Sequence, residues 1–155
     1  SGQSAAAFAR QIGHSQSRRR TTALGGVGLR PSEKADAAIS AADLIAVVQQ
    51  EIPPLDKTFF RTESKLAAAL TRLDGAWRAA RHHLDAGSGP AAAILRAREA
   101  AAMIANARWV VVSALARRET RGLNRRLDFP QQDPALTHRL RTGGLDQVWL
   151  RHLAD

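Results

Sequence analysis

The chain contains no cysteine, which excludes several kinds of site at once. A disulfide scaffold, a thiolate zinc site and a cysteine nucleophile all need that residue, and its absence fits a reducing compartment such as the cytoplasm. Uninterrupted apolar runs are also short, and none approaches the roughly 18 residues that cross a bilayer. The opening SGQSAAAFAR lacks the basic start and apolar core of a secretory signal. We therefore expect neither a membrane span nor a signal sequence.

Lysine is also scarce, since only three of the 23 basic residues are lysines. The net charge of +9 lies mainly at the two ends: residues 1–34 carry six basic groups against one acid, and residues 117–155 carry eight against five. Residues 35–116 are nearly balanced, with nine against eight. With 155 residues, 45% of them hydrophobic, the chain is long enough for one domain with a real core.

Three long helices are predicted. Ser40 and Asp43 form an approximate capping box for the first, and Pro53-Pro54 ends it. Thr62 caps the second, which runs to about residue 84 with one continuous apolar face: Leu66, Leu70, Leu73, Trp77 and Leu84. Pro90 opens the third, expected over residues 91–119. Between Ala100 and Leu115 this helix is apolar nearly all round, so we expect it to be buried between neighbours.

The predicted fold class is all-α, an antiparallel three-helix bundle over residues 40–136. An irregular basic segment precedes it: residues 1–12 read as a short helix and residues 13–39 as a linker or surface loop. Residues 120–136 are expected to be extended or irregular. Residues 137–155 form a C-terminal extension or a short hairpin around Gly143-Gly144.

The sequence contains only weak signals for phosphate-binding, metal-binding and nucleophilic sites. GGVG at 25–28 follows no strand and opens no helix, as a phosphate-binding loop would require. The histidines lack metal-ligand spacing, so we predict surface histidines and no metal site: His14, His82, His83, His138 and His152. Nothing resembles a nucleophile elbow, and the acids are scattered, mostly beside arginines on faces expected to be exposed.

Residues 117–130, RRETRGLNRRLDFP, stand out because arginines crowd the end of the third helix. The positive charges of such a cluster repel one another unless carboxylates, carbonyls or phosphates bind them. A solvated helix terminus, where positive charge complements the helix dipole, is the simpler alternative. Gly122 is predicted to close the helix in a left-handed C′ conformation.

This segment closely resembles the one that ends the long C-terminal helix in the succinate dehydrogenase, fumarate reductase and L-aspartate oxidase flavoproteins. The residues that match that family's motif are Arg118, Glu119, Arg121, Gly122, Asp128, Phe129 and Pro130. Thr120 stands for the usual Ser and Asn124 for the usual His. The order of the helices and the closing QVWLRH also agree, and SGQSAAAFARQI looks like the last helix of the family's FAD-binding domain.

The resemblance implies a parent oxidoreductase that binds FAD on a Rossmann-type domain and substrate under a capping domain. No position here matches the family's dinucleotide fingerprint, substrate histidines or catalytic arginine. We therefore expect no catalytic, cofactor-binding or metal residue in this chain, and regard it as the C-terminal helical domain alone. Its partners would be the FAD-binding and capping domains, in the same chain or a separate one.

Within the family, Gly122-Leu123 and Leu127-Asp128 look more like L-aspartate oxidases, which convert L-aspartate to iminoaspartate for NAD biosynthesis. The dehydrogenases tend to carry Ala and an acidic residue at those places. The alternatives are the same domain of a succinate dehydrogenase or fumarate reductase, and a free-standing basic module that binds nucleic acid. The residues predicted at the domain interface are Glu119, Arg121, Asn124, Arg126 and Asp128.

Overall fold

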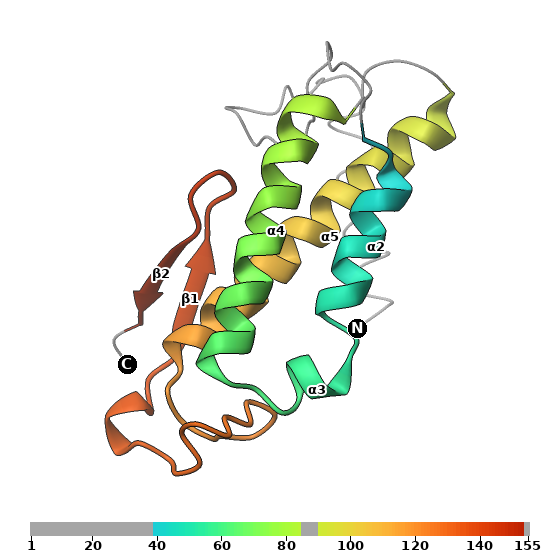
Figure 1. Cartoon of the computed structure of the whole chain (residues 1–155). Helices are drawn as coiled ribbons and strands as arrows, with labels where there is room; N and C mark the ends of the chain where they lie inside the picture. The colour runs from blue at the N-terminus through green and yellow to red at the C-terminus, as the bar shows by residue number, and fades with distance from the viewer. Residues whose placement is uncertain (1–38, 85–89, 154–155) are drawn as a thin grey trace, which may run out of the picture.

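The computed structural model describes residues 39–84 and 90–153, so the predicted helix at 1–12, nearly all of the 13–39 linker, His14 and GGVG lie outside the described residues. Three helices form the body of the described part: α2 (Ala41–Glu51), α4 (Glu63–His83) and α5 (Ala91–Ala116). Each contacts the other two, and consecutive helices run in opposite directions (Figure 1). The predicted antiparallel three-helix bundle is confirmed.

The helix starts follow the predicted caps. The Ser40 hydroxyl accepts a hydrogen bond from the Asp43 backbone N–H at 3.1 Å, and Asp43 Oδ2 accepts from the Ser40 N–H at 3.3 Å. At α4, the Thr62 hydroxyl accepts from the backbone of Lys65. Helix α5 begins at Ala91 as predicted, and Pro90 occupies its N-cap without a side-chain hydrogen bond. At α2 and α4 the side chains supply such bonds. These local bonds replace those that the first turn of a helix lacks.

Helix α2 ends at Glu51, directly before Ile52 and the two prolines. The following segment contains a short helix that the sequence analysis did not anticipate, α3 (Leu55–Thr58), which leads into α4. Its Lys57 reaches back to Glu51 at 3.2 Å, and Arg72 of α4 pairs with the same carboxylate at 2.7 Å. Glu51 is 3% exposed, so this acid belongs to the interior rather than to a solvated face.

The core lies between α4 and α5 and is closed by α2. Leu73 and Ile104 are fully buried, and Trp77 is 2% exposed. Alanines supply much of the contact surface on α5, including Ala97, Ala100 and Ala101, which lets the helices approach closely. Of the stripe predicted for α4, Leu66, Leu73, Trp77 and Leu84 are buried and Leu70 is partly buried against the core, so the stripe is confirmed.

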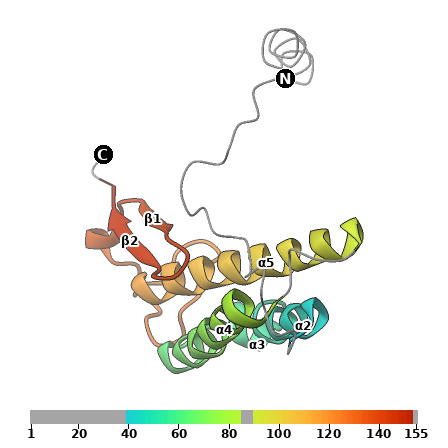
Figure 2. The same ribbon diagram turned by 90° about the horizontal axis from the view of Figure 1, so that it is seen from above.

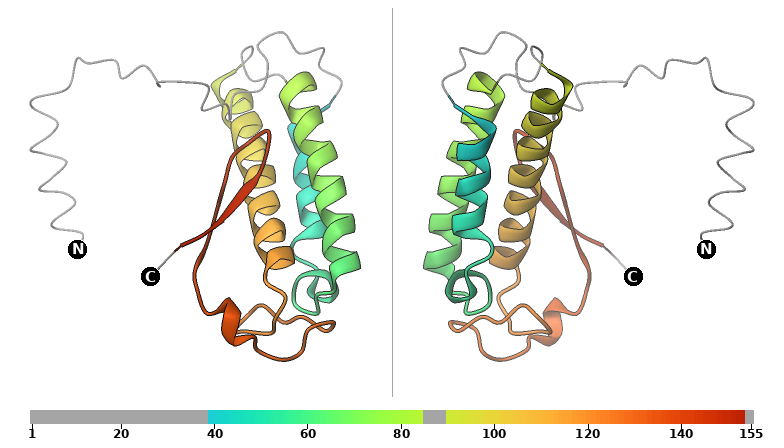
Figure 3. Two further views of the ribbon diagram at one scale, coloured as in Figure 1. Left: turned by 90° about the vertical axis from the view of Figure 1, so that its left-hand side faces the viewer. Right: turned by 90° about the vertical axis from the view of Figure 1, so that its right-hand side faces the viewer.

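After α5 the chain passes through an irregular segment and the short 3-10 helix η1 (Pro134–Leu136) into a hairpin. Strands β1 (Leu140–Gly143) and β2 (Trp149–His152) pair antiparallel, with Gly143 opposite Trp149. The hairpin lies beside α5, and its turn also reaches α4 (Figure 3). Gly144 adopts a φ of +87°, which favours glycine, so the hairpin predicted from Gly143-Gly144 is confirmed.

Side chains of the helices hold the tip of this hairpin. Trp109 donates to the Gly144 carbonyl at 2.7 Å, and Trp77 donates to the Asp146 carboxylate at 3.1 Å. Arg108, only 4% exposed, pairs with Asp74 at 2.6 Å and donates to the carbonyls of Leu145 and Asp146. A buried arginine in the apolar stretch of α5 therefore ties α4, α5 and the hairpin together.

Helix α5 is long and apolar enough, by averaged composition, to cross a membrane, and it is the one such helix in the described ranges. Charged residues such as Arg108 divide the apolar stretch of α5, so it contains no uninterrupted apolar run long enough to span a bilayer. In the structure α5 is the central helix of the bundle, with nine buried residues. The core helix of a helical bundle meets the same compositional test.

Candidate docking site at the end of the long helix

The segment after α5 forms a tight loop that begins earlier than predicted. The helix ends at Ala116, three residues short of Glu119, and Arg117 already has extended backbone angles. Gly122 does adopt a left-handed φ of +57°, but it lies in a turn where the backbones of Arg121 and Asn124 exchange two 3.0 Å hydrogen bonds. The prediction that Gly122 closes the helix is therefore wrong, because another side chain binds the last carbonyls.

That side chain is Arg126, which is fully buried. Its Nη1 donates to the carbonyls of Ala114 and Leu115, at 2.9 and 3.3 Å, in the last turn of α5. The last carbonyls of a helix have no partner within the helix and carry the negative end of its dipole. The Arg126 guanidinium donates hydrogen bonds to these carbonyls and places a positive charge at the negative end of the dipole. Its own charge is balanced by the carbonyls and by a carboxylate.

The carboxylate is Asp128, which receives two parallel hydrogen bonds from Arg126, at 2.8 and 2.9 Å. The same carboxylate accepts from the backbone N–H of Glu63, the first residue of α4, at 2.6 Å. The Arg126 guanidinium, with the Glu63 N–H, lowers the pKa of Asp128 to about 2. Asp128 thus binds the positive end of α4 while its partner binds the negative end of α5.

Glu119 is the second buried acid of this loop, with no exposed surface. Arg121 and Arg117 donate to its Oε1 at 2.8 and 2.7 Å, and the Asp133 backbone N–H donates to Oε2 at 2.9 Å. Chiefly through the Arg121 hydrogen bond, these donors lower its pKa to about 2 despite burial. The expectation that the acids lie mostly on exposed faces is wrong for Glu119 and Glu51, because these two carboxylates are buried beneath basic side chains that remain partly exposed.

Asn124, at the place of the family's usual His, uses both ends of its amide. Its Oδ1 accepts from Arg61 at 2.7 Å, and its Nδ2 donates to the carbonyls of Glu119 and Arg117 at 2.9 and 3.2 Å. Arg61 lies 63 residues away in sequence, and no spacing or motif pointed to it. Burial and the neighbouring charge of Arg126 lower the pKa of Arg61.

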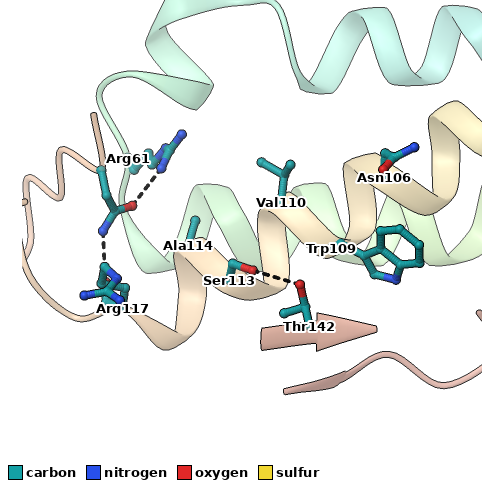
Figure 4. Close-up of a pocket in the computed structure, with 9 residues that line it drawn as sticks. Arg61, Asn106, Trp109, Val110, Ser113, Ala114, Arg117 and Thr142 are labelled. Atoms are coloured by element: carbon teal, nitrogen blue, oxygen red, sulfur yellow. Dashed lines mark hydrogen bonds between the residues drawn. The ribbon is translucent and has the colours of Figure 1, made fainter. Parts of the chain in front are cut away.

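A cavity of about 430 Å³ opens beside this loop (Figure 4). Arg61 and Arg117 lie toward one end of it, Trp109 and Asn106 toward the other, and Val110 and Ala114 between them. Ser113 and Thr142 face each other across 3.4 Å at its edge. The lining contains no carboxylate, so the cavity offers an apolar surface with a cationic, hydrogen-bonding end rather than an acid–base pair.

The structure brings the five predicted interface residues into one loop. Arg126 and Glu119 are interior, whereas the side chains of Arg121 and Asp128 keep 35% and 27% of their surface exposed and Asn124 is half-buried. All five make hydrogen bonds within the chain. Their contact with another domain stays a prediction, to which Arg121 and Asp128 contribute the most accessible atoms.

The histidines are distributed as follows. His82, His83 and His152 are exposed, and His138 is half-buried with its ring 4.3 Å from that of His152. Sequence spacing did not suggest this last pair, since the hairpin creates it. In the part of the chain that the structure describes, no group of three or more His, Asp or Glu side chains is placed to hold a metal ion.

Comparison with known proteins gives one match. Residues 50–154, about two thirds of the chain, match the family described as fumarate reductase flavoprotein C-term. The chain belongs to this family. No curated protein and no solved structure matches it. The matched range includes α4, α5, the buried arginine–carboxylate loop and the hairpin.

Membership implies FAD in the parent flavoprotein oxidoreductase and other domains of that enzyme as partners. The described residues do not fit a site for FAD, because their one sheet is a two-stranded antiparallel hairpin without the strand–turn–helix unit that cradles a dinucleotide. The chemistry of the flavin is therefore not assigned to any side chain described here.

Proposed function

We propose that this chain is the C-terminal helical domain of an FAD-dependent L-aspartate oxidase. In this proposal its task is to pack on the FAD-binding domain, and it is not catalytic alone. The parent enzyme would oxidise L-aspartate to iminoaspartate, with two electrons passing to the flavin. The proposal goes one step beyond the flavoprotein family to which the chain belongs.

The observation that carries the proposal is the exposure of two leucines in the family motif. Leu123 and Leu127 stand where the dehydrogenases tend to carry Ala and an acidic residue. Leu123 is 82% exposed and Leu127 is 52% exposed. Leucines held at the surface by a rigid loop favour contact with another domain, and their type favours the oxidase member of the family.

The proposal that the chain is not catalytic alone is supported by the contacts that the charged side chains of the motif make. Arg126 and Asp128 bind helix ends and each other, and Glu119 is bound by Arg117 and Arg121. None of the three lines the cavity of Figure 4. Groups held this way stabilise a docking module. They are not arranged as a nucleophile and base within reach of a substrate.

The test is to immunopurify the native protein from its source cells and record its mass, its flavin absorbance and its response to substrates without oxygen. We expect flavin in a species much heavier than 16.7 kDa, bleached by L-aspartate and not by succinate. Bleaching by succinate, or co-purification with an iron–sulfur subunit, would assign the domain to a succinate dehydrogenase or fumarate reductase instead. A colourless 16.7 kDa species would refute both assignments.

Family membership argues against a free-standing module that binds nucleic acid. The contacts of the chain's arginine side chains argue against it as well. Within the described ranges Arg108, Arg117 and Arg126 are bound to carboxylates and carbonyls inside the chain. Binding to mixed-sequence DNA that weakens steeply with added salt is the result that would favour such a module.

A further inference from the structure

Helix α5 is apolar nearly all round, and we expected it to be buried between neighbours. The structure bears this out only in part: nine residues of α5 are buried, but only 44% of its most apolar 18-residue window is buried. Three large apolar side chains of α5 remain exposed: Leu95 at 58%, Met103 at 37% and Val110 at 49%. No fourth long helix packs against α5 in the described ranges, so one side of α5 has no helical partner there.

These side chains lie on one face. Residues 95, 99, 103, 106 and 110 are spaced by three or four positions, which places them along one side of a helix, and all are exposed. In Figure 2, α2 and α4 lie on one side of α5, and the hairpin covers only one end of the other. We call this strip of Leu95, Glu99, Met103, Asn106 and Val110 the open face of α5; its three large apolar side chains are interrupted by one acid and one amide.

The open face leads into the cationic end of the cavity, where Arg61 has an unusual position. Among the described arginines that are not exposed, Arg61 is the one without a carboxylate partner. It donates to the carbonyl of Thr58 and to Asn124, and it lies near the positive charge of Arg126. A half-buried charge with a like charge beside it calls for an anion from outside these residues.

We infer that the open face of α5, with Arg61 at its end, is the surface on which the FAD-binding domain of the same flavoprotein docks. That domain would cover the strip with apolar side chains and set a carboxylate against Arg61. The inference rests on the proposed docking role. Membership in a flavoprotein domain family indicates the partner. The uncovered strip, with Leu95, Met103 and Val110 as its large side chains, provides the contact area, and Arg61 indicates a negative charge on the partner.

Site-specific cross-linking tests this surface in the native protein. A benzoylphenylalanine replaces Met103 or Val110 in the protein expressed in its source cells, and the cross-linked peptides are sequenced after illumination. Arg78 on α4, which is exposed, is the control position. We expect positions 103 and 110, and not 78, to cross-link to peptides of the FAD-binding domain, whether that domain is in the same polypeptide or another.

Links from 103 and 110 to α5 of a second copy, to residues 1–38 of this chain, or to no peptide would each overturn the inference. A second experiment examines the charge. Arg61→Gln should lower the cross-link yield from position 110 by about tenfold or more, because loss of one member of a buried charge pair weakens binding at least that much. Arg61→Lys should restore part of it, and Arg78→Gln should leave it unchanged. Circular dichroism verifies that each variant is folded.

The result of the cross-linking experiment can be distinguished from the result that tests the proposed function. Cross-linking asks which domain covers α5, and the bleaching experiment asks which substrate reduces the flavin. A succinate-reduced enzyme whose FAD-binding domain cross-links to position 110 would refute the oxidase assignment and support the docking surface. An L-aspartate-reduced enzyme without those cross-links would do the reverse.

Discussion

Arg126 and Asp128, separated by one residue, join the C-terminus of α5 to the N-terminus of α4. The guanidinium binds carbonyls of Ala114 and Leu115, the carboxylate binds the Glu63 N–H, and the two bind each other through a fork of two hydrogen bonds. Each charge has the sign that stabilises the helix end it contacts. One pair thus fixes the angle and spacing of the two longest helices at the end where the family motif lies.

Removing the buried cation should therefore destabilise the bundle strongly. Arg126→Gln leaves Asp128 unpaired and the last carbonyls of α5 without their donor. Breaking a buried pair by loss of one partner costs about 3–5 kcal/mol, and we expect a loss of this size in the free energy of unfolding, measured by urea denaturation and circular dichroism.

The matched control is Arg118→Gln. Arg118 pairs with Glu63 at 3.4 Å, but both side chains are more than half exposed. Solvated pairs contribute at most about 1 kcal/mol. If the two variants lost equal stability, burial of Arg126 would not be the reason for its contribution.

The two acids with lowered pKa values make stability depend on pH. Glu119 and Asp128 both have a pKa of about 2 in the folded chain, below their ordinary range near 4. Their contribution is therefore complete above about pH 5 and is lost as the pH falls toward 2. We expect the free energy of unfolding, measured by urea denaturation, to decrease over that interval.

Glu119→Gln isolates one of the two acids. At pH 7 the variant should be less stable than the parent, because the side chains of Arg117 and Arg121 lose their carboxylate. The difference should shrink as the pH falls, since the parent then protonates the same group. A difference that stayed constant from pH 7 to pH 3 would show that Glu119 does not titrate as the structure implies.

Variants of Asn124 test the main departure from the family motif, which usually has His at this position. It makes three hydrogen bonds, two as donor and one as acceptor. Asn124→Ala removes them all and should cost about 1–3 kcal/mol, because partly buried groups lose their partners. A neutral imidazole has one donor and one acceptor, so Asn124→His should lie between alanine and asparagine. Thermal denaturation of the three proteins gives the order, and a histidine variant no better than alanine would contradict it.

How much of the fold and of the candidate site could be predicted from the sequence depends on how far apart along the chain the interacting residues lie. The caps at Ser40 and Thr62 and the glycines of the hairpin act within a few residues, so their sequence signals are sufficient. The end of α5 was misplaced because Gly122 is a typical stop signal, whereas the last carbonyls are bound by Arg126 from the far side of the loop.

Buried charges escaped prediction for a related reason. Apolar periodicity identifies core positions only when they are apolar, so Arg108 looked like an interruption of α5 rather than the group that holds the hairpin. The contact between Arg61 and Asn124 spans 63 positions, and neither residue belongs to a pattern that includes the other. Such contacts depend on the packed arrangement of the helices, which one sequence does not specify residue by residue.

The last prediction concerns docking rather than folding. Arg121 is one of the predicted interface residues, and its side chain keeps 35% of its surface exposed. Arg121→Ala should weaken association with the FAD-binding domain while the bundle stays folded, because Arg117 and the Asp133 N–H still bind Glu119. Docking is measured by titrating the purified chain with the FAD-binding domain, with circular dichroism as the check on folding. An unchanged affinity would refute the interface role of Arg121, and the docking contact would then have to lie elsewhere, with the open face of α5 and Arg61 as the surface to examine next.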